Sequence, residues 1–188
     1  CISAVHNFGL KKDMDVLIYG AGPMGMGVAN YLQVIGAHVV LVDGIQKRLD
    51  YAKKYFGIEQ TVNIQVRKLS ECCAPKSFDA VMDIVGDTGI LLEGTNYLKQ
   101  GGTLCSMGVL KESDAMLNLL KLQNNTKLHM LNLPYRRMDY MDELVKLIRE
   151  EKIVPKHYYS HVLPVEKISE CVQLIRNKDA LKVVLSFD

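Results

Sequence analysis

The chain has 188 residues, 48% of them hydrophobic and 23% charged, and its formal net charge at pH 7 is +2. This length suffices for one domain with a buried core and a modest extension. Because the net charge is small and both signs are mixed along the chain, nothing predicts a nucleic acid or a membrane surface as partner, and no apolar run approaches the ~20 residues of a membrane span.

The first 15 residues have the pattern of the end of a helix, since Ile2, Val5 and Phe8 share one helical face and Gly9 interrupts the pattern. A natural protein rarely starts on such a segment without an initiator methionine, so we expect the sequence to be part of a longer one. Since these residues lack a basic segment followed by a long apolar core, we expect a cytoplasmic protein.

Short apolar runs then alternate with helical patterns up to about residue 150. Near-continuous apolar runs are typical of parallel strands covered on both faces, and their alternation with helices implies right-handed crossovers. The sequence therefore predicts an α/β fold with a doubly wound parallel sheet of six strands. The predicted strands are 16–19, 38–42, 61–64, 78–85, 103–107 and 127–132, and the predicted helices are 24–35, 46–56, 66–73, 90–98, 114–120 and 138–150, with Gly101 and Gly102 in a turn.

The last of these helices is expected to bury Met141, Leu144, Val145 and Ile148. From Val154 the pattern changes to a short tail. Because six strands already complete the sheet, the tail is expected to belong to another structural unit. The predicted organisation is one domain over 1–153 and a C-terminal segment over 154–188, which contains a strand over 158–163, a helix over 165–176 and a strand over 181–187.

The most informative stretch follows the first apolar run, where residues 20–25 have the pattern G-x-G-x-x-G. Between a buried strand and a helix, this pattern is typical of a turn that binds the pyrophosphate of a dinucleotide. Gly20 would make the tight turn, Gly22 would let the backbone approach the phosphates, and Gly25 would let the helix pack on the sheet. Asp43 ends the next apolar run, as expected for a residue that binds the ribose. The alternative interpretation is a structural glycine turn.

Cysteines and histidines predict no metal site. The cysteines are an odd number without compact spacing, which indicates reduced thiols, and the five histidines are isolated from third partners. Neither a C-x-x-C pair nor a serine, histidine and aspartate constellation occurs. The five cysteines are Cys1, Cys72, Cys73, Cys105 and Cys171; we interpret Cys105 as core and the adjacent pair as the end of a short helix with one half-buried thiol.

Five motifs follow one another over nearly the whole chain, at residues 16–25, 42–54, 78–86, 101–108 and 182–185. In this order and spacing the chain resembles the medium-chain dehydrogenase/reductase superfamily, and within it the zinc-type alcohol and polyol dehydrogenases. The resemblance implies a Rossmann fold that binds NAD(P). It also implies that the tail returns to a catalytic domain, which in this family is formed largely by sequence that precedes these motifs.

The resemblance assigns the cofactor to residues at the carboxyl ends of the strands. Asp43 would accept hydrogen bonds from both ribose hydroxyls and repel a 2′-phosphate, so NAD(H) is expected rather than NADP(H). Arg48 matches a basic residue beside the ribose or is a solvated surface charge, and Asp83 matches an acidic residue that could instead bind only nearby backbone. The expected cofactor-binding residues are Gly20, Gly22, Pro23, Met24, Gly25, Asp43, Arg48, Val85, Met107, Gly108 and Leu133.

The activity implied by the resemblance is NAD-dependent hydride transfer between an alcohol or polyol and the cofactor, while zinc polarises the substrate oxygen. In the family the zinc ligands lie mostly in an N-terminal part, so this chain is expected to hold neither zinc nor a catalytic residue. Two other classes stay open. One is a regulatory domain that senses NAD(H) without chemistry, and the other is a methyltransferase, which the proline in the glycine turn disfavours.

The predicted sixth strand, 127–132, would lie at an edge of the sheet, where N–H and C=O groups lack a partner strand. Only Lys127 and His129 interrupt its apolar positions. In the family that the chain resembles, two subunits join their sheets at this strand. We therefore expect a homodimer through residues 127–132.

Overall fold

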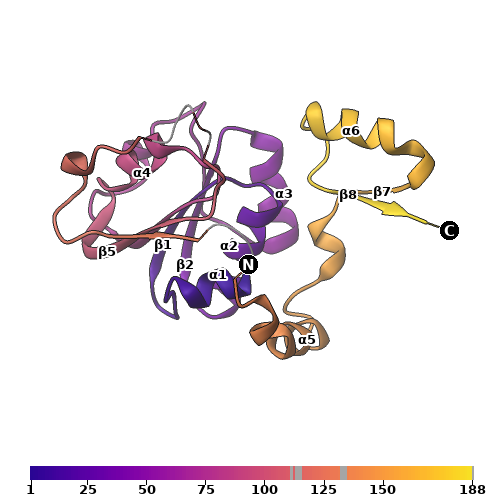
Figure 1. Cartoon of the computed structure of the whole chain (residues 1–188), viewed down its shortest axis with the longest axis horizontal. Helices are drawn as coiled ribbons and strands as arrows, with labels where there is room; N and C mark the ends of the chain where they lie inside the picture. Colours follow the sequence, from indigo (N-terminus) through magenta and orange to yellow (C-terminus); the bar gives the residue numbers. More distant parts are fainter. Residues whose placement is uncertain (111, 113–115, 132–134, 188) are drawn as a thin grey trace.

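The computed structural model describes residues 1–110, 112, 116–131 and 135–187. Within these residues, six parallel strands form one sheet in the order β3-β2-β1-β4-β5-β6 (Figure 1), which confirms the predicted doubly wound α/β fold. No helix of this described part is long and apolar enough to cross a membrane. The strands are β1 Asp15–Tyr19, β2 His38–Asp43, β3 Thr61–Asn63, β4 Phe78–Asp83, β5 Leu98–Ser106 and β6 Lys127–Met130.

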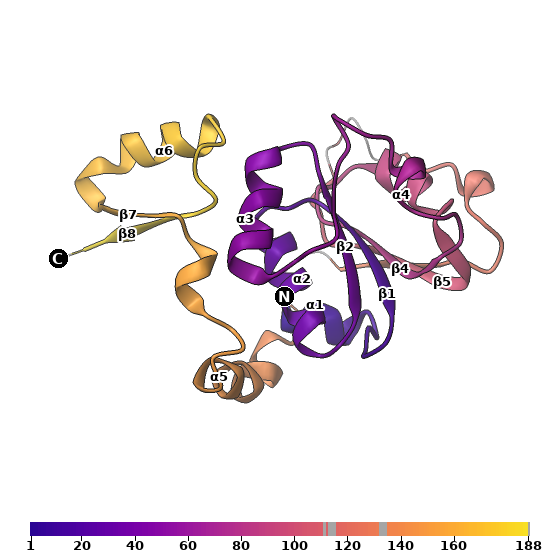
Figure 2. The ribbon, with the colours of Figure 1, turned by 180° about the vertical axis from the view of Figure 1, so that it is seen from behind.

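Different helices bury the two faces of this sheet (Figure 2). In β1, Val16 and Ile18 pack toward one face while Leu17 and Tyr19 pack toward the other. Because successive side chains of a strand point to opposite faces, a strand covered on both sides must be apolar throughout. The first face carries α1 Ile2–Asn7, α2 Pro23–Val34, α3 Gln46–Phe56 and α5 Met141–Arg149, and the second carries α4 Thr88–Gly94.

Local sequence explains where these helices begin and end. Pro23 is the first residue of α2, a position where its missing N–H costs no hydrogen bond. The carboxylate of Asp87 accepts a hydrogen bond from the N–H of Gly89 and caps α4. Gly57 ends α3 in the left-handed conformation, with φ of 64°.

Two predicted helices are shorter than expected. In place of a helix over 66–73 there is a 3₁₀ helix, Leu69–Glu71. Val66 is 73% exposed, and Leu69 and Cys73 are the buried residues of this segment, so it has little apolar surface to bury as a longer helix. In place of a helix over 90–98, α4 ends at Gly94 and the chain enters β5 at Leu98.

The predicted turn at Gly101 and Gly102 is instead part of β5. Phe78 pairs with Leu98 but Ala80 pairs with Thr103, so extra residues of β5 bulge between these two pairs. Gly101 has φ of +79°, a conformation that an L side chain rarely adopts. The glycines therefore serve a bulge within a strand rather than a connection between elements.

The segment before and within α5 also differs from prediction. Residues 114 and 115 of the predicted helix over 114–120 lie outside the described residues, and the described remainder contains only the start of the 3₁₀ helix Leu119–Lys121. A second 3₁₀ helix, Arg137–Tyr140, precedes α5. In α5, Leu147 is buried whereas Met141 and Val145 are 40% and 39% exposed.

The orientation of α5 follows from Glu143. Its carboxylate lies 3.0 Å from Nε2 of His6 on α1 and accepts a hydrogen bond from Oη of Tyr31 on α2. Holding Glu143 against these two helices turns Leu144 and Ile148 toward the core and leaves Val145 at the surface.

The tail forms a second sheet, in which β7 His161–Pro164 pairs in parallel with β8 Val183–Ser186. α6 Ile168–Arg176 connects the two strands, and 3₁₀ helices at Pro155–Tyr158 and Val165–Lys167 precede β7 and α6. Figure 1 shows this unit, drawn in yellow, beside α3 and apart from the main sheet. Within the described part of the chain, the tail thus adds no strand to the six-stranded sheet, as expected.

Candidate functional site

The glycine turn after β1 is tight and leaves open space at the start of α2. Gly20 has φ of +106°, and its N–H donates a hydrogen bond to the carbonyl of Val42, 2.8 Å away. A Cβ atom at Gly25 would lie 1.7 Å from the carbonyl oxygen of Gly20, so only glycine lets α2 pack on the turn. A Cβ atom at Gly22 would meet no heavy atom within 4 Å. Gly25 therefore serves the fold, whereas Gly22 borders open space at the start of α2.

Asp43 lies at the end of β2, beside this turn, and is 9% exposed. One carboxylate oxygen accepts a hydrogen bond from the N–H of Ala21 at 2.7 Å, and the other accepts one from the N–H of Ile45 at 2.8 Å. Nη1 of Arg48 lies 3.6 Å from the same carboxylate. The hydrogen bond to Ala21 joins the glycine turn to β2. Because each carboxylate oxygen has two lone pairs, Asp43 can still accept hydrogen bonds from a ligand.

Asp83, at the end of β4, is fully buried and organises the turn between β4 and α4. One of its oxygens accepts hydrogen bonds from the N–H groups of Val85 and Gly86, both at 2.9 Å. The other accepts from the N–H of Asp87 at 3.3 Å and from Oγ of Ser106 on β5 at 3.2 Å. These contacts support the interpretation of Asp83 as a residue that binds nearby backbone.

The turns after β4 and β5 lie against each other. The N–H groups of Met107 and Gly108 donate to the carbonyl of Asp83, at 2.9 and 3.3 Å. A Cβ atom at Gly108 would lie 2.0 Å from the backbone nitrogen of Gly86. Met107 and Gly108 therefore lie beside Val85, which is 56% exposed. The sequence-predicted Leu133 lies outside the described residues.

These turns all follow the carboxyl ends of neighbouring strands. The sheet continues from β1 to β2 and β3 on one side and from β4 to β6 on the other. The strand order therefore reverses between β1 and β4, the point at which open α/β sheets bind ligands. Open space at Gly22, the N-terminus of α2 and the carboxylate of Asp43 come together at this point.

The described residues do not fit a zinc site. Over 1–110, 112, 116–131 and 135–187 there is no group of three or more His, Cys, Asp or Glu side chains that could hold a metal ion.

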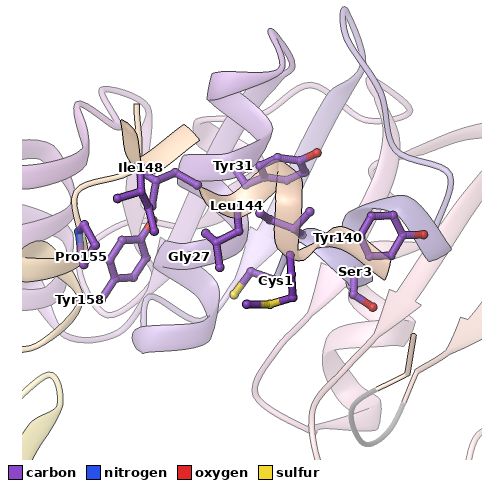
Figure 3. A pocket seen from close by; sticks show the side chains of 12 residues that line it. Cys1, Ser3, Gly27, Tyr31, Tyr140, Leu144, Ile148, Pro155 and Tyr158 are labelled. Atoms are coloured by element: carbon purple, nitrogen blue, oxygen red, sulfur yellow. The ribbon is translucent and has the colours of Figure 1, made fainter. Parts of the chain in front are cut away.

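A separate apolar hollow of about 410 Å³ lies between α1, α2, α5 and the 3₁₀ helix Pro155–Tyr158 (Figure 3). At its margin the hydroxyl of Tyr31 lies 2.9 Å from Nε2 of His6. Burial raises the pKa of Tyr31, and the carboxylate of Glu143 raises it further. His6, Tyr31 and Glu143 form a polar cluster here. The sequence did not predict it, because the three residues come from different helices and share no motif. The side chains labelled around the hollow include Cys1, Ser3, Tyr31, Tyr140, Leu144, Ile148, Pro155 and Tyr158.

The chain is similar to known dehydrogenases. Over 182 residues it is 24% identical to D-arabinitol dehydrogenase 1 of Uromyces fabae, and this alignment covers 93% of the chain and 52% of that protein. Over 115 residues it is 35% identical to L-threonine 3-dehydrogenase of Aliivibrio fischeri, which covers 57% of the chain and 33% of that protein. The chain thus spans about half or less of these relatives.

Solved structures show the same fold. The alcohol dehydrogenase TADH from Thermus sp. ATN1 superposes with a TM-score of 0.85 at 24% identity, covering 100% of this chain and 55% of that one. L-idonate 5-dehydrogenase from Escherichia coli superposes with a TM-score of 0.84 at 23% identity, covering 99% and 54%. The family model described as zinc-binding dehydrogenase matches residues 23–150. Because this match covers more than half of the chain, the chain belongs to the zinc-binding dehydrogenase family.

Proposed function

We propose that this chain is the NAD(H)-binding part of an NAD-dependent dehydrogenase that acts on an alcohol or polyol. The observation that carries the proposal is the open space at Gly22 next to the carboxylate of Asp43. The similarity to dehydrogenases of D-arabinitol and L-threonine supports an alcohol carbon as the site of reaction.

The residues of the turn have distinct roles in this proposal. The backbone at Gly22, Pro23 and Met24 and the N-terminus of α2 hold the pyrophosphate, while Asp43 accepts hydrogen bonds from the ribose hydroxyls. Because the charge of Arg48 is directed at Asp43, it supports that carboxylate rather than a 2′-phosphate. When bound, NAD⁺ supplies the hydride acceptor.

The remaining roles belong to the rest of the site. Val85, Met107 and Gly108 form the wall along the nicotinamide. The zinc and the catalytic groups lie outside the described residues of this chain. We further propose a dinucleotide-binding domain over 1–153, a C-terminal segment over 154–188 that belongs with the catalytic domain, and a homodimer through 127–132.

A titration of the chain with NADH and with NADPH, followed by the fluorescence of the reduced nicotinamide, tests the proposal. We expect NADH to bind at least about tenfold more tightly, a difference of ~1.4 kcal/mol. Asp43→Ala should narrow this preference, whereas Asp50→Ala, which removes an exposed carboxylate from α3, should not. Equal binding of the two nucleotides by the unaltered chain would refute the role of Asp43, and binding of S-adenosylmethionine in place of NADH would favour a methyltransferase.

A further inference from the structure

Two adjacent thiols, Cys72 and Cys73, follow the 3₁₀ helix Leu69–Glu71. The N–H groups of both cysteines donate to the carbonyl of Leu69, each at 2.9 Å, so the pair sits on one tight turn. The two side chains differ in burial, since Cys72 is exposed and Cys73 is 8% exposed. One thiol of the pair is therefore accessible directly, and access to the other depends on its immediate surroundings.

A hollow of about 350 Å³ provides that access. Cys72 and Cys73 both line it, together with the apolar residues Val40 and Phe78 and the polar residues His38 and Gln60. Burial raises the pKa of the Cys73 thiol, and the adjacent Cys72 raises it further. The hollow thus combines two cysteines with a lining that is partly polar and partly apolar.

This hollow is remote from the nucleotide site. Its lining includes Asp15 and His38, the first residues of β1 and β2, whereas the glycine turn and Asp43 lie at the other ends of the same strands. A strand of five or six residues spans ~17–20 Å. A ligand in the hollow and a dinucleotide at Gly22 would therefore not overlap.

The number of thiols limits the chemistry of a ligand. Among the described residues no third His, Cys, Asp or Glu completes a metal-binding group here, so the pair lacks the four ligands of a structural zinc site. Soft elements that prefer thiolate sulfur and need only two protein ligands remain. Trivalent arsenic that already carries one organic substituent meets this description, because two further bonds complete its three-coordinate shell.

We propose that Cys72 and Cys73 form a two-thiol site for monosubstituted trivalent arsenicals, with the organic group against Val40 and Phe78. For an organic arsenoxide, two S–As bonds form as the As=O bond breaks, and the two thiol protons leave with the oxygen as one water molecule. No oxidation state changes. The aryl group of phenylarsine oxide would occupy the apolar part of the hollow.

Intact-mass spectrometry of the chain with phenylarsine oxide, in excess monothiol, tests the site. A monothiol competes away adducts on single cysteines but not a two-thiol adduct, so we expect one adduct per chain, with the mass of one phenylarsine oxide less one water. A small dithiol should remove it. Saturating NADH should leave its formation unchanged within about twofold, because the two sites lie at opposite ends of the strands.

Substitutions identify the thiols. Cys72→Ser and Cys73→Ser should each reduce adduct retention by at least tenfold, whereas Cys171→Ser, which removes a buried thiol on α6, should not. Because Cys72 is exposed, its substitution should leave the thermal unfolding temperature unchanged, which separates loss of the site from loss of the fold. No stable adduct on the unaltered chain, or full retention in Cys72→Ser, would overturn the proposal.

Discussion

Gly22 and Gly25 lie three residues apart in one turn, but an added methyl group would meet different surroundings at each. At Gly25 it would overlap the carbonyl of Gly20, whereas at Gly22 it would point into open space. We expect Gly25→Ala to destabilise the fold by about 3 kcal/mol. We expect Gly22→Ala to cost less than about 1 kcal/mol, as for alanine in place of glycine at a helix N-cap, while NADH binding weakens at least tenfold.

Thermal unfolding and NADH titration of the two variants together measure these effects. Gly57→Ala, at the end of α3, is a useful reference, since it is strained by its positive φ but lies away from the turn. Normal NADH binding by a folded Gly22→Ala variant would contradict the placement of the pyrophosphate at that residue.

A second residue-scale prediction concerns Lys99, whose Nζ lies 2.9 Å from a carboxylate oxygen of Asp15 and 2.9 Å from one of Asp79. Burial alone would raise the pKa of Asp79, but hydrogen bonds from Lys99 and from the N–H of Asp15 outweigh it and hold that pKa below its ordinary value. A carboxyl group with a lower pKa in the folded state stabilises the fold above its unfolded pKa, near 4, and this contribution disappears as pH falls through the folded value.

Lys99→Met should therefore lower the free energy of unfolding at pH 7, by less than about 1 kcal/mol because the cluster is partly exposed to solvent. The difference from the unaltered chain should shrink as the pH falls from about 5 to about 2. Urea unfolding at several pH values measures it, with Lys146→Met, at an exposed pair with Glu150, as the control. A difference that stays constant down to pH 2 would assign the effect to packing of the Lys99 stem instead.

At the scale of elements, strands were easier to predict than helices. Runs such as β1 and β2 are buried on both faces, so their local sequence already carries the signal. The segments 66–73 and 90–98 have apolar residues at helical spacing. In the second segment Leu98 pairs with Phe78 of β4, 20 residues earlier, and therefore belongs to a strand. Likewise, the glycines at 101 and 102 look like a turn until their pairing with β4 is known.

In the candidate site, too, local features could be predicted from the sequence and contacts between distant residues could not. The glycine pattern and Asp43 are local features, and their placement beside each other follows from parallel strands that end at one edge. The N–H of Ala21 donates a hydrogen bond to Asp43, which lies 22 positions further along the chain. The hydroxyl of Ser106 donates one to Asp83, which lies 23 positions earlier. No local pattern carries such contacts, because they depend on how strands and turns pack.

The edge strand β6 gives a prediction at this scale. The N–H of Leu131 donates to the carbonyl of Ser106 on β5. Since backbone groups alternate in direction along a strand, those of His129 also face β5 whereas those of Met130 face the open edge. Met130→Pro should therefore remove a donor from the edge without breaking the pairing with β5.

If two chains join at β6, Met130→Pro should raise the dissociation constant of the dimer in sedimentation experiments and leave NADH binding intact. His129→Pro is the matched control, because it removes a donor that faces β5 and should destabilise the fold itself. A chain that stays monomeric at high concentration would contradict the proposed dimer.

At the scale of the whole molecule, we expect this chain to bind NADH without catalysing a reaction. The described residues contain the glycine turn that we propose to bind the nucleotide, but no group of three metal-binding side chains. We therefore expect the 188-residue chain to bind NADH and to oxidise neither alcohols nor polyols, with or without added zinc. Assays of NADH formation from several alcohols check this, and zinc-dependent turnover by the purified chain would contradict it.

The tail contacts the main body mainly through Pro155–Tyr158, where the rings of His157 and Tyr158 pack against Phe56. Oη of Tyr158 accepts a hydrogen bond from Asn30 at 2.7 Å, and Oη of Tyr51 donates one to the carbonyl of His157 at 3.1 Å. Beyond this connection, Asp179 forms an exposed ion pair with Lys47. Of the described helices, α6 packs against the β7–β8 sheet, and two strands with one helix bury little apolar surface.

Such a unit can open while the six-stranded sheet stays closed, so the chain should have two separate levels of local stability. Amide hydrogen exchange would resolve them. The amides of Leu163 and Val184, which face the partner strand within the β7–β8 sheet, should exchange after local opening. Those of Leu17 and Val81, in the buried centre of the main sheet, should exchange only when the whole domain unfolds. In a longer protein that covers the tail, slower exchange at Leu163 and Val184 would report the docking of the tail directly.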